Sequence, residues 1–194
     1  RMEFWWALAA LVGVLFFGTL QGIVVAIILS LVSLAAQVAN PRVHIIGRQK
    51  GTGILRPLSP RHQDDETIAG LLILRPEGRL FFLNAQQVAD QIQAAISTYA
   101  PRVIVLDLSS VVDIEYTALQ MLENGRERLS FQDLTLWLAG PNPTVLDYLR
   151  HAKLVDALGP NAIFHSAEAA LHAYSGASAS QATASLGAEL LERE

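Results

Sequence analysis

Residues Val103–Leu122, VIVLDLSSVVDIEYTALQML, decide the fold of this chain. The run Val103–Leu106 is apolar and mostly β-branched, which is typical of a strand buried on both faces of a parallel sheet. Asp107 and the serines that follow it indicate a polar turn at the carboxyl end of this strand. From Thr117 onward, apolar residues recur at helical spacing. The stretch therefore predicts a strand, a polar loop and a helix with Thr117 in its first turn.

Further strands and helices alternate on both sides of this stretch. Before it, we expect strands over 70–75 and 79–83, paired as a hairpin across a turn at 76–78. Asn84 is expected to cap the next helix, with its side-chain oxygen accepting from first-turn amides. After it, the sequence predicts a strand over 134–139, a helix over 144–158, a strand over 162–164 and a helix over 166–174. This alternation predicts an α/β fold with a mixed sheet.

Composition divides the chain into an apolar N-terminal segment and an ordinary globular remainder. Hydrophobic residues make up 52% of the 194 residues and charged residues only 16%, which is apolar for a soluble chain. No charged residue occurs between Phe4 and Val38. The net charge of −4 argues against nucleic acid as a partner. The absence of cysteine excludes disulfides and thiol chemistry.

The uncharged segment predicts two transmembrane helices. As one helix, its roughly 35 residues would span about 50 Å, well beyond a hydrocarbon core of about 30 Å. The two glycines and the glutamine in 18–22 place a break there. We therefore expect helices over about 4–17 and 22–39, joined by a tight turn. Trp5 and Trp6 lie at the entrance, where interfacial aromatic residues are common.

A basic segment follows the expected membrane helices. Between residues 41 and 63 there is no acidic residue, and the basic residues are Arg42, Arg48, Lys50, Arg56 and Arg61. A basic excess beside a membrane helix marks the cytoplasmic side of the inner or plasma membrane. The predicted organisation is a transmembrane hairpin over 1–40, a basic juxtamembrane linker over 41–66, a cytoplasmic domain over 67–175 and a disordered Ala/Ser-rich tail over 176–194.

Short motifs in the central stretch resemble the STAS domain, the module shared by sulfate transporters and anti-sigma-factor antagonists. The strand ends in Asp107-Leu108-Ser109, and the helix starts with Glu115-Tyr116-Thr117-Ala118-Leu119. The passage Leu80-Phe-Phe-Leu-Asn-Ala and the basic segment after the expected hairpin resemble the SulP family of anion permeases. The resemblance implies a STAS-like domain preceded by the last two membrane helices of such a transporter.

Several further expectations follow from this resemblance alone. The substrate-binding site would lie in helices upstream of Arg1, and the anion (sulfate, bicarbonate or a dicarboxylate) is left open. The expected partners are membrane lipid, the upstream transporter helices, a second copy in a homodimer and a regulatory protein at the STAS loop. The STAS domain would serve regulation, assembly or stability, and the chain would be the carboxyl-terminal part of the transporter.

Asp113, Glu115 and Thr117 form the candidate regulatory loop. In the antagonist branch, the hydroxyl at the position of Thr117 is the phospho-acceptor that controls partner binding. This sequence departs from that branch, with Glu for Asp at 115, Tyr for a small residue at 116, Thr for Ser at 117 and Ala for Gly at 118. We therefore favour a structural role for Thr117 at the helix start over a phosphorylation site.

The acidic residues of the central stretch do not predict catalysis. Asp107, Asp113 and Glu115 could form a metal or acid/base site, but capping of turns and of the helix start explains them better. The five histidines lack metal-ligand spacing, and no phosphate-binding loop or nucleophile elbow occurs. We expect no metal, no cofactor and no enzymatic activity. Two functions remain open, a part of an anion transporter or a membrane-tethered STAS phospho-switch or scaffold without transport.

Overall fold

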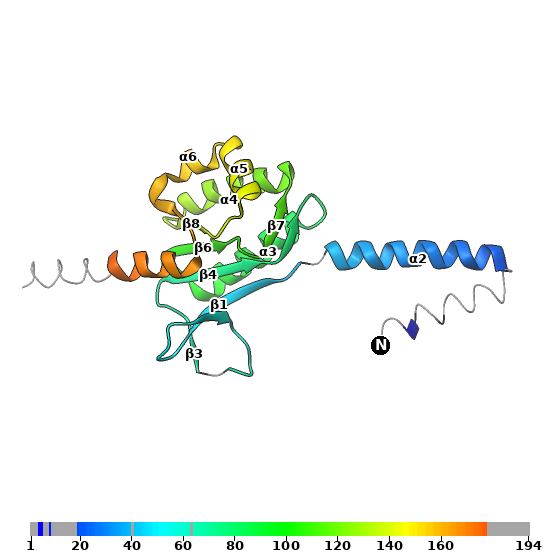
Figure 1. The fold of residues 1–194 in the computed structure, drawn as a ribbon, viewed down its shortest axis with the longest axis horizontal. Helices are drawn as coiled ribbons and strands as arrows, with labels where there is room; N and C mark the ends of the chain where they lie inside the picture. The colour runs from blue at the N-terminus through cyan, green and yellow to red at the C-terminus, as the bar shows by residue number, and fades with distance from the viewer. Residues whose placement is uncertain (1–3, 6–7, 9–18, 40, 63, 178–194) are drawn as a thin grey trace, which may run out of the picture. The chain divides into compact units, whose positions relative to one another are not determined.

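The computed structural model describes residues 4–5, 8, 19–39, 41–62 and 64–177 (Figure 1). The chain divides into two compact units, Arg1–Pro41 and Arg42–Glu194. Most of the first predicted membrane helix, over 4–17, and most of the predicted tail, over 176–194, lie outside the described residues.

The N-terminal unit contains one long described helix, α2, which spans the 21 residues Thr19–Ala39. It begins inside the predicted turn at 18–22. Large apolar side chains are exposed along it, among them Leu20, Ile27 and Leu31. Within the described residues, no helix reaches the length and apolar character that crossing a membrane requires. The structure therefore does not show the predicted transmembrane hairpin.

The second unit is built on a mixed sheet of seven strands in the order β2-β1-β4-β6-β8-β9, with β3 also paired to β1. The strands are β1 (Val43–Gln49), β2 (Leu55–Pro57), β3 (Asp65–Glu66), β4 (Leu71–Pro76), β6 (Val103–Asp107), β8 (Thr135–Ala139) and β9 (Ile163–Phe164). Strands β4, β6, β8 and β9 run parallel, and β1 is antiparallel to β4. The predicted central strand, now β6, lies between two parallel neighbours, which explains its continuous apolar sequence. The predicted α/β fold with a mixed sheet is confirmed.

The predicted hairpin between strands 70–75 and 79–83 is wrong. Strand β5 (Gly78–Leu80) pairs in parallel with β7 (Val111–Ile114), and these two strands form a separate small sheet. Both edges of β4 are already occupied by β1 and β6, so β5 has no edge of β4 to join. Gly78 adopts a φ of 88°, a left-handed conformation that suits glycine, and turns the chain away between the two strands.

The predicted linker over 41–66 is also wrong, because this segment contributes three strands to the sheet. Ile46 in β1 is buried, and β1 pairs with β2, β3 and β4. The basic residues obscured this strand pattern in the sequence. Two of them pair with Glu66, whose carboxylate lies 4.0 Å from Arg48 and 3.3 Å from Lys50. The acidic residues at the end of the segment therefore face its basic residues across the sheet.

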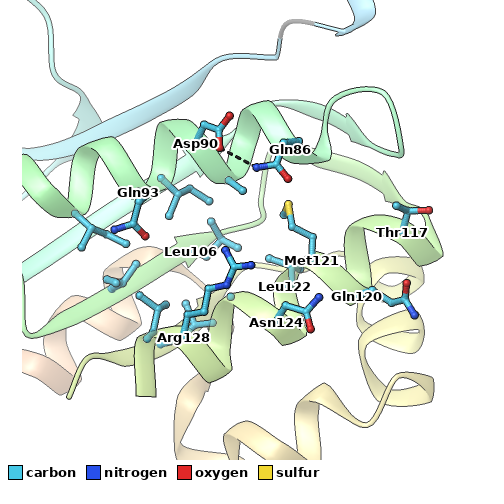
Figure 2. A pocket seen from close by; sticks show the side chains of 17 residues that line it. Gln86, Asp90, Gln93, Leu106, Thr117, Gln120, Met121, Leu122, Asn124 and Arg128 are labelled. Atoms are coloured by element: carbon cyan, nitrogen blue, oxygen red, sulfur yellow. Dashed lines mark hydrogen bonds between the residues drawn. The ribbon is translucent and has the colours of Figure 1, made fainter. Parts of the chain in front are cut away.

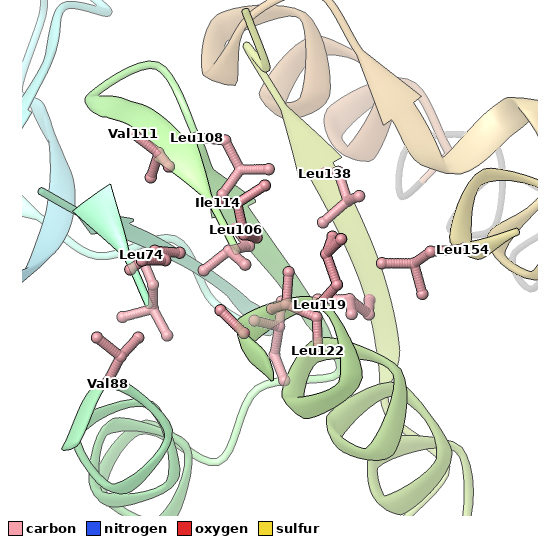
Figure 3. Close-up of a cluster of buried hydrophobic side chains, with 14 of the residues drawn as sticks. Leu74, Val88, Leu106, Leu108, Val111, Ile114, Leu119, Leu122, Leu138 and Leu154 are labelled. Carbon is pink, nitrogen blue, oxygen red and sulfur yellow. The ribbon is translucent and has the colours of Figure 1, made fainter. Parts of the chain in front are cut away.

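Helices cover both faces of the sheet (Figure 1). One face carries α3 (Ala85–Tyr99), α4 (Tyr116–Ser130), α5 (Pro143–His151) and α6 (Leu154–Leu158). The larger core lies beneath them, and Figure 3 shows ten of its residues: Leu74, Val88, Leu106, Leu108, Val111, Ile114, Leu119, Leu122, Leu138 and Leu154. On the other face, a helix over the described residues 167–177, orange in Figure 1, packs Ala167, Ala170 and Leu171 against Ile73 and Val105.

The helix predicted over 144–158 is broken in two. Helix α5 ends at His151, and Lys153 takes a left-handed φ of 57° before α6 begins at Leu154. The change of direction lets Leu154 reach the core, where its side chain is buried. Helical periodicity continues across the break in the sequence, so the interruption could not be read from spacing. A short 3₁₀ turn, Pro160–Ala162, then leads into β9.

An ion pair between Arg56 of β2 and Asp65 of β3 should make the stability of the domain depend on pH. The Arg56 guanidinium donates two short hydrogen bonds to Asp65, of 2.8 and 2.7 Å, and this holds the pKa of the Asp65 carboxyl below its ordinary value. A lowered folded-state pKa stabilises the fold above the unfolded pKa of about 4, and this contribution is lost as the pH falls through the folded value. The thermal midpoint should therefore fall more steeply on acidification in the wild type than in Asp65→Asn. Parallel pH curves for the two proteins would contradict this.

Candidate regulatory site at the start of helix α4

The loop between β7 and α4 is held by hydrogen bonds from two other segments, the end of β5 and the start of α5. The Glu115 amide donates to the Leu80 carbonyl at 2.8 Å, next to the β5–β7 pairing. The side chain of Asn142, at the start of α5, donates to the carbonyls of Val111 at 2.9 Å and Val112 at 3.2 Å. The same side chain accepts from the Val145 amide and caps α5. The candidate loop is therefore fixed by its neighbours rather than by its own sequence.

Arg79 brings two of the predicted site residues together. Its guanidinium lies 3.0 Å from the Asp113 carboxylate and 2.9 Å from the Glu115 carboxylate. Arg79 was not among the predicted site residues, because a hairpin would pair its strand with β4. Strand β5 instead pairs with β7, which places Arg79 opposite Asp113. Both carboxylates face the same guanidinium and form an ion-pair cluster with it.

This Arg79 cluster lies in a shallow groove of about 450 Å³. Its walls are formed by Arg79, Asp113, Ile114, Glu115, Tyr116, Leu119, Tyr148, His151 and Ala152. The side chains of Tyr116 and Tyr148 are exposed. Charged and aromatic groups at an open surface suit the recognition of another molecule better than chemistry on a substrate.

The structure separates Thr117 from Asp113 and Glu115. Thr117 is exposed and lines a different groove, between α3 and α4, as Figure 2 shows. The capping position of α4 is held by Glu115 in an extended conformation, and Tyr116 and Thr117 follow as the first helical residues. The predicted place of Thr117 in the first turn is confirmed, but it is not the capping residue.

Two buried polar side chains near this loop have structural roles. Asp107 is only 1% exposed. Its Oδ2 accepts hydrogen bonds from the Arg75 guanidinium, with Nε 2.7 Å away, and its Oδ1 accepts from the Ser109 amide.

Asn84 precedes α3 at the capping position, but its side chain accepts no hydrogen bond from the first-turn amides of α3. The predicted capping bond is therefore wrong. The side-chain oxygen of Asn84 accepts from the Phe81 amide at 3.0 Å, and its nitrogen donates to the Arg79 carbonyl at 2.7 Å. Asn84 therefore holds the backbone next to Arg79.

The side chains around the start of α4 are not arranged as metal ligands. Among the residues that the structure describes, no group of three or more histidine, aspartate or glutamate side chains is arranged to hold a metal ion. The carboxylates of the loop are occupied by Arg79, and that of Asp107 by Arg75. What the arrangement offers is a rigid, charged and aromatic surface.

Thr117→Ala should change the free energy of unfolding by less than about 0.5 kcal/mol, because the side chain is exposed and caps no helix. Thr117→Glu should be tolerated equally well, since a carboxylate is favourable in the first turn of a helix. Chemical denaturation of the wild type and both variants measures this.

The matched control for the Thr117 variants is Leu119→Ala, two residues along the same helix. Leu119 is buried, so this change should cost about 2–5 kcal/mol. A loss above about 1 kcal/mol for Thr117→Ala would mean that its hydroxyl has a structural bond in solution.

The matched family agrees with this fold. The STAS domain family matches residues 62–170, more than half of the chain, and the chain belongs to that family. Sulfate transporter 1.1 of Arabidopsis thaliana is 26% identical over 174 residues, covering 84% of this chain and 27% of the relative. The chain thus spans about a quarter of the length of the curated relatives it matches. The predicted resemblance to the sulfate-transporter branch of STAS proteins, the SulP family, is confirmed.

Solved structures share the fold. The murine Solute Carrier 26 family member A9, an anion transporter solved in its inward-facing state, superposes on 87% of this chain and 28% of its own, with a TM-score of 0.71 and 19% identity. The STAS domain of a SulP transporter from Vibrio cholerae covers 61% of this chain and 92% of its own, with a TM-score of 0.50 and 23% identity.

Proposed function

We propose that this chain is part of a SulP-like secondary anion transporter, in which it supplies the STAS domain and the membrane segment that precedes it. One observation carries the proposal. The alignment with Sulfate transporter 1.1 covers 84% of the chain, whereas the STAS match covers residues 62–170 alone. The likeness therefore extends beyond the domain that transporters share with other STAS proteins.

The composition of the N-terminal segment supports a membrane location. It carries no charge from Phe4 to Val38, and the 21-residue helix α2 exposes large apolar side chains between Leu20 and Leu34. We propose the transmembrane hairpin over 1–40 on this basis, in contact with membrane lipid and with further helices of the transporter. The five basic residues between 41 and 63 support a cytoplasmic STAS domain in an inner or plasma membrane protein.

The STAS domain is proposed to act through packing in a homodimer. Four large apolar side chains are exposed near the starts of α3 and α4: Phe82 and Leu83 before α3, Val112 in β7 and Tyr116 at the first position of α4. Clustered exposed apolar residues commonly mark a surface for another protein. The double variant Phe82→Ser with Tyr116→Ser should weaken self-association, as measured by analytical ultracentrifugation. Unchanged self-association would show that these side chains do not form a dimer interface.

Uptake of labelled sulfate by proteoliposomes tests the transport proposal. The 194-residue chain alone should insert without transporting, because two helices cannot enclose a midplane site with alternating access. The complete reading frame that contains the chain should transport sulfate, bicarbonate or a dicarboxylate. Uptake by the chain alone, or a complete frame without further apolar helices, would overturn the proposal.

A second candidate function, a membrane-tethered STAS phospho-switch or scaffold without transport, rests on the exposure of Thr117. A kinase could reach this hydroxyl, which lies at the first turn of α4 where the helix dipole favours a phosphate. In that case Thr117→Ala and Thr117→Glu would shift binding of a regulatory protein in opposite directions at unchanged stability. Equal binding by both variants would exclude the switch.

A further inference from the structure

The groove between α3 and α4 has the size and lining of a small-molecule site. Its volume is about 360 Å³, within the roughly 300–1,000 Å³ of ligand pockets. The floor is apolar and contains Ile92, Ile96, Ile104, Leu106, Met121 and Leu122. The rim is polar and includes Gln86 and Asp90 of α3 and Gln120 and Asn124 of α4 (Figure 2). An apolar floor with few polar groups at its edge is the usual composition of such a site.

Gly125 keeps this groove open. It lies in the interior of α4, where glycine favours the helix less than alanine does. Its φ is not left-handed, and a Cβ built on it meets no atom within 4 Å. Neither backbone conformation nor close packing therefore requires glycine here. A larger residue at this position would extend into the groove that Gly125 lines.

Arg128 supplies a positive charge over the apolar floor. Figure 2 shows its side chain reaching from α4 across the groove toward α3. Within the described part of the chain, Arg128 forms no ion pair, and the Asp90 carboxylate on the facing helix accepts from Gln86 at 2.8 Å instead. Placement in the last turn of α4 suits a basic residue, but it does not require the guanidinium to lie over apolar side chains.

We propose that the α3–α4 groove binds a small organic anion, with its apolar body on the floor and its carboxylate or sulfonate on Arg128. The volume sets the size of the ligand, the floor sets its apolar body, and the unpaired guanidinium sets its charge. This site is distinct from the Arg79 cluster, and it does not depend on whether the chain takes part in transport.

Binding of naphthoate to the full chain in lipid nanodiscs tests the site, with empty nanodiscs subtracted by equilibrium dialysis. Naphthoate should bind saturably, and the neutral isostere naphthalenemethanol should bind about tenfold more weakly, because it lacks the charge-assisted bond. Arg128→Gln should weaken naphthoate binding about tenfold, and Arg128→Lys should restore part of it. Arg150→Gln, which removes a charge from α5 outside the groove, is the matched control and should bind normally.

Gly125 provides a second and independent pair of variants. Gly125→Leu should abolish naphthoate binding while the thermal midpoint stays unchanged or rises, because leucine favours the helix. Gly125→Ala should raise the midpoint and leave binding intact. Absence of saturable binding, or binding that is indifferent to both Arg128→Gln and Gly125→Leu, would overturn the proposal. A change of oligomeric state in Gly125→Leu would also overturn it, since a second copy would then occupy the groove.

Discussion

A piece of this chain that begins at Thr67 is expected to lose cooperative unfolding, whereas one that begins at Arg42 should unfold as a stable domain. Strand β1 pairs with β4 over Val43–Ile46 and buries Ile46 in the smaller core, which also contains Ile73 and Val105. Without it, β4 becomes an open edge strand with exposed apolar side chains. Val43, Ile45 and Ile46 all lose burial, at up to roughly 1.5–3 kcal/mol each, so more than about 3 kcal/mol is lost from a total of about 5–15.

Thermal and urea unfolding of the pieces 42–177 and 67–177 measure this difference. Ile46→Ala in the longer piece is the graded control, and it should cost about 2–5 kcal/mol without removing cooperativity. Equal midpoints for the two pieces would show that β1 is dispensable. In that event the domain boundary predicted at residue 67 would be the better one.

Asp107→Ala should destabilise the domain by about 3 kcal/mol, because it leaves the largely buried Arg75 guanidinium, 22% exposed, without its partner. The change also removes the acceptor for the Ser109 amide in the turn after β6. Asp113→Ala is the matched control, since Asp113 is partly exposed and its ion pair with Arg79 is worth at most about 1 kcal/mol.

The double variant Arg75→Met with Asp107→Leu separates loss of the pair from loss of packing. It should recover much of the stability lost in Asp107→Ala, since replacing both members of a buried pair with apolar residues is often neutral. Denaturant midpoints of the three proteins provide the comparison. If Asp107→Ala cost no more than Asp113→Ala, the buried pair would contribute nothing to stability.

Local signals in the sequence were strong where one segment carries its own pattern. The run Val103–Leu106 identified the central strand, because a strand flanked by two parallel neighbours is apolar at successive positions. The helix that starts around Thr117 and the helix that follows Asn84 were both expected from the sequence, and they are α4 and α3. The motifs around Asp107 and Glu115 were sufficient to indicate the STAS family.

Pairing between distant segments was decided only by the tertiary structure. Hairpin formation is a local expectation, but β5 joined β7 because both edges of β4 were occupied. This pairing placed Arg79 between Asp113 and Glu115, and no sequence spacing links residues so far apart. Likewise, the basic residues in 41–66 made this segment resemble a linker, so β1 was not predicted. Their acidic partners Asp65 and Glu66 come close to them only when the strands are paired.

The sequence by itself determined the fold class, the family and the position of Thr117 in the first turn of α4, because these depend on contiguous residues. The tertiary structure alone decided that Thr117 lines the α3–α4 groove and that Asp113 and Glu115 line another. The physical reason is that the three residues belong to different elements. Asp113 lies in β7 opposite Arg79, and Glu115 precedes α4, whereas Thr117 lies within α4. The surface that Thr117 lines depends on the packing of α3 beside α4, which no local sequence pattern reports.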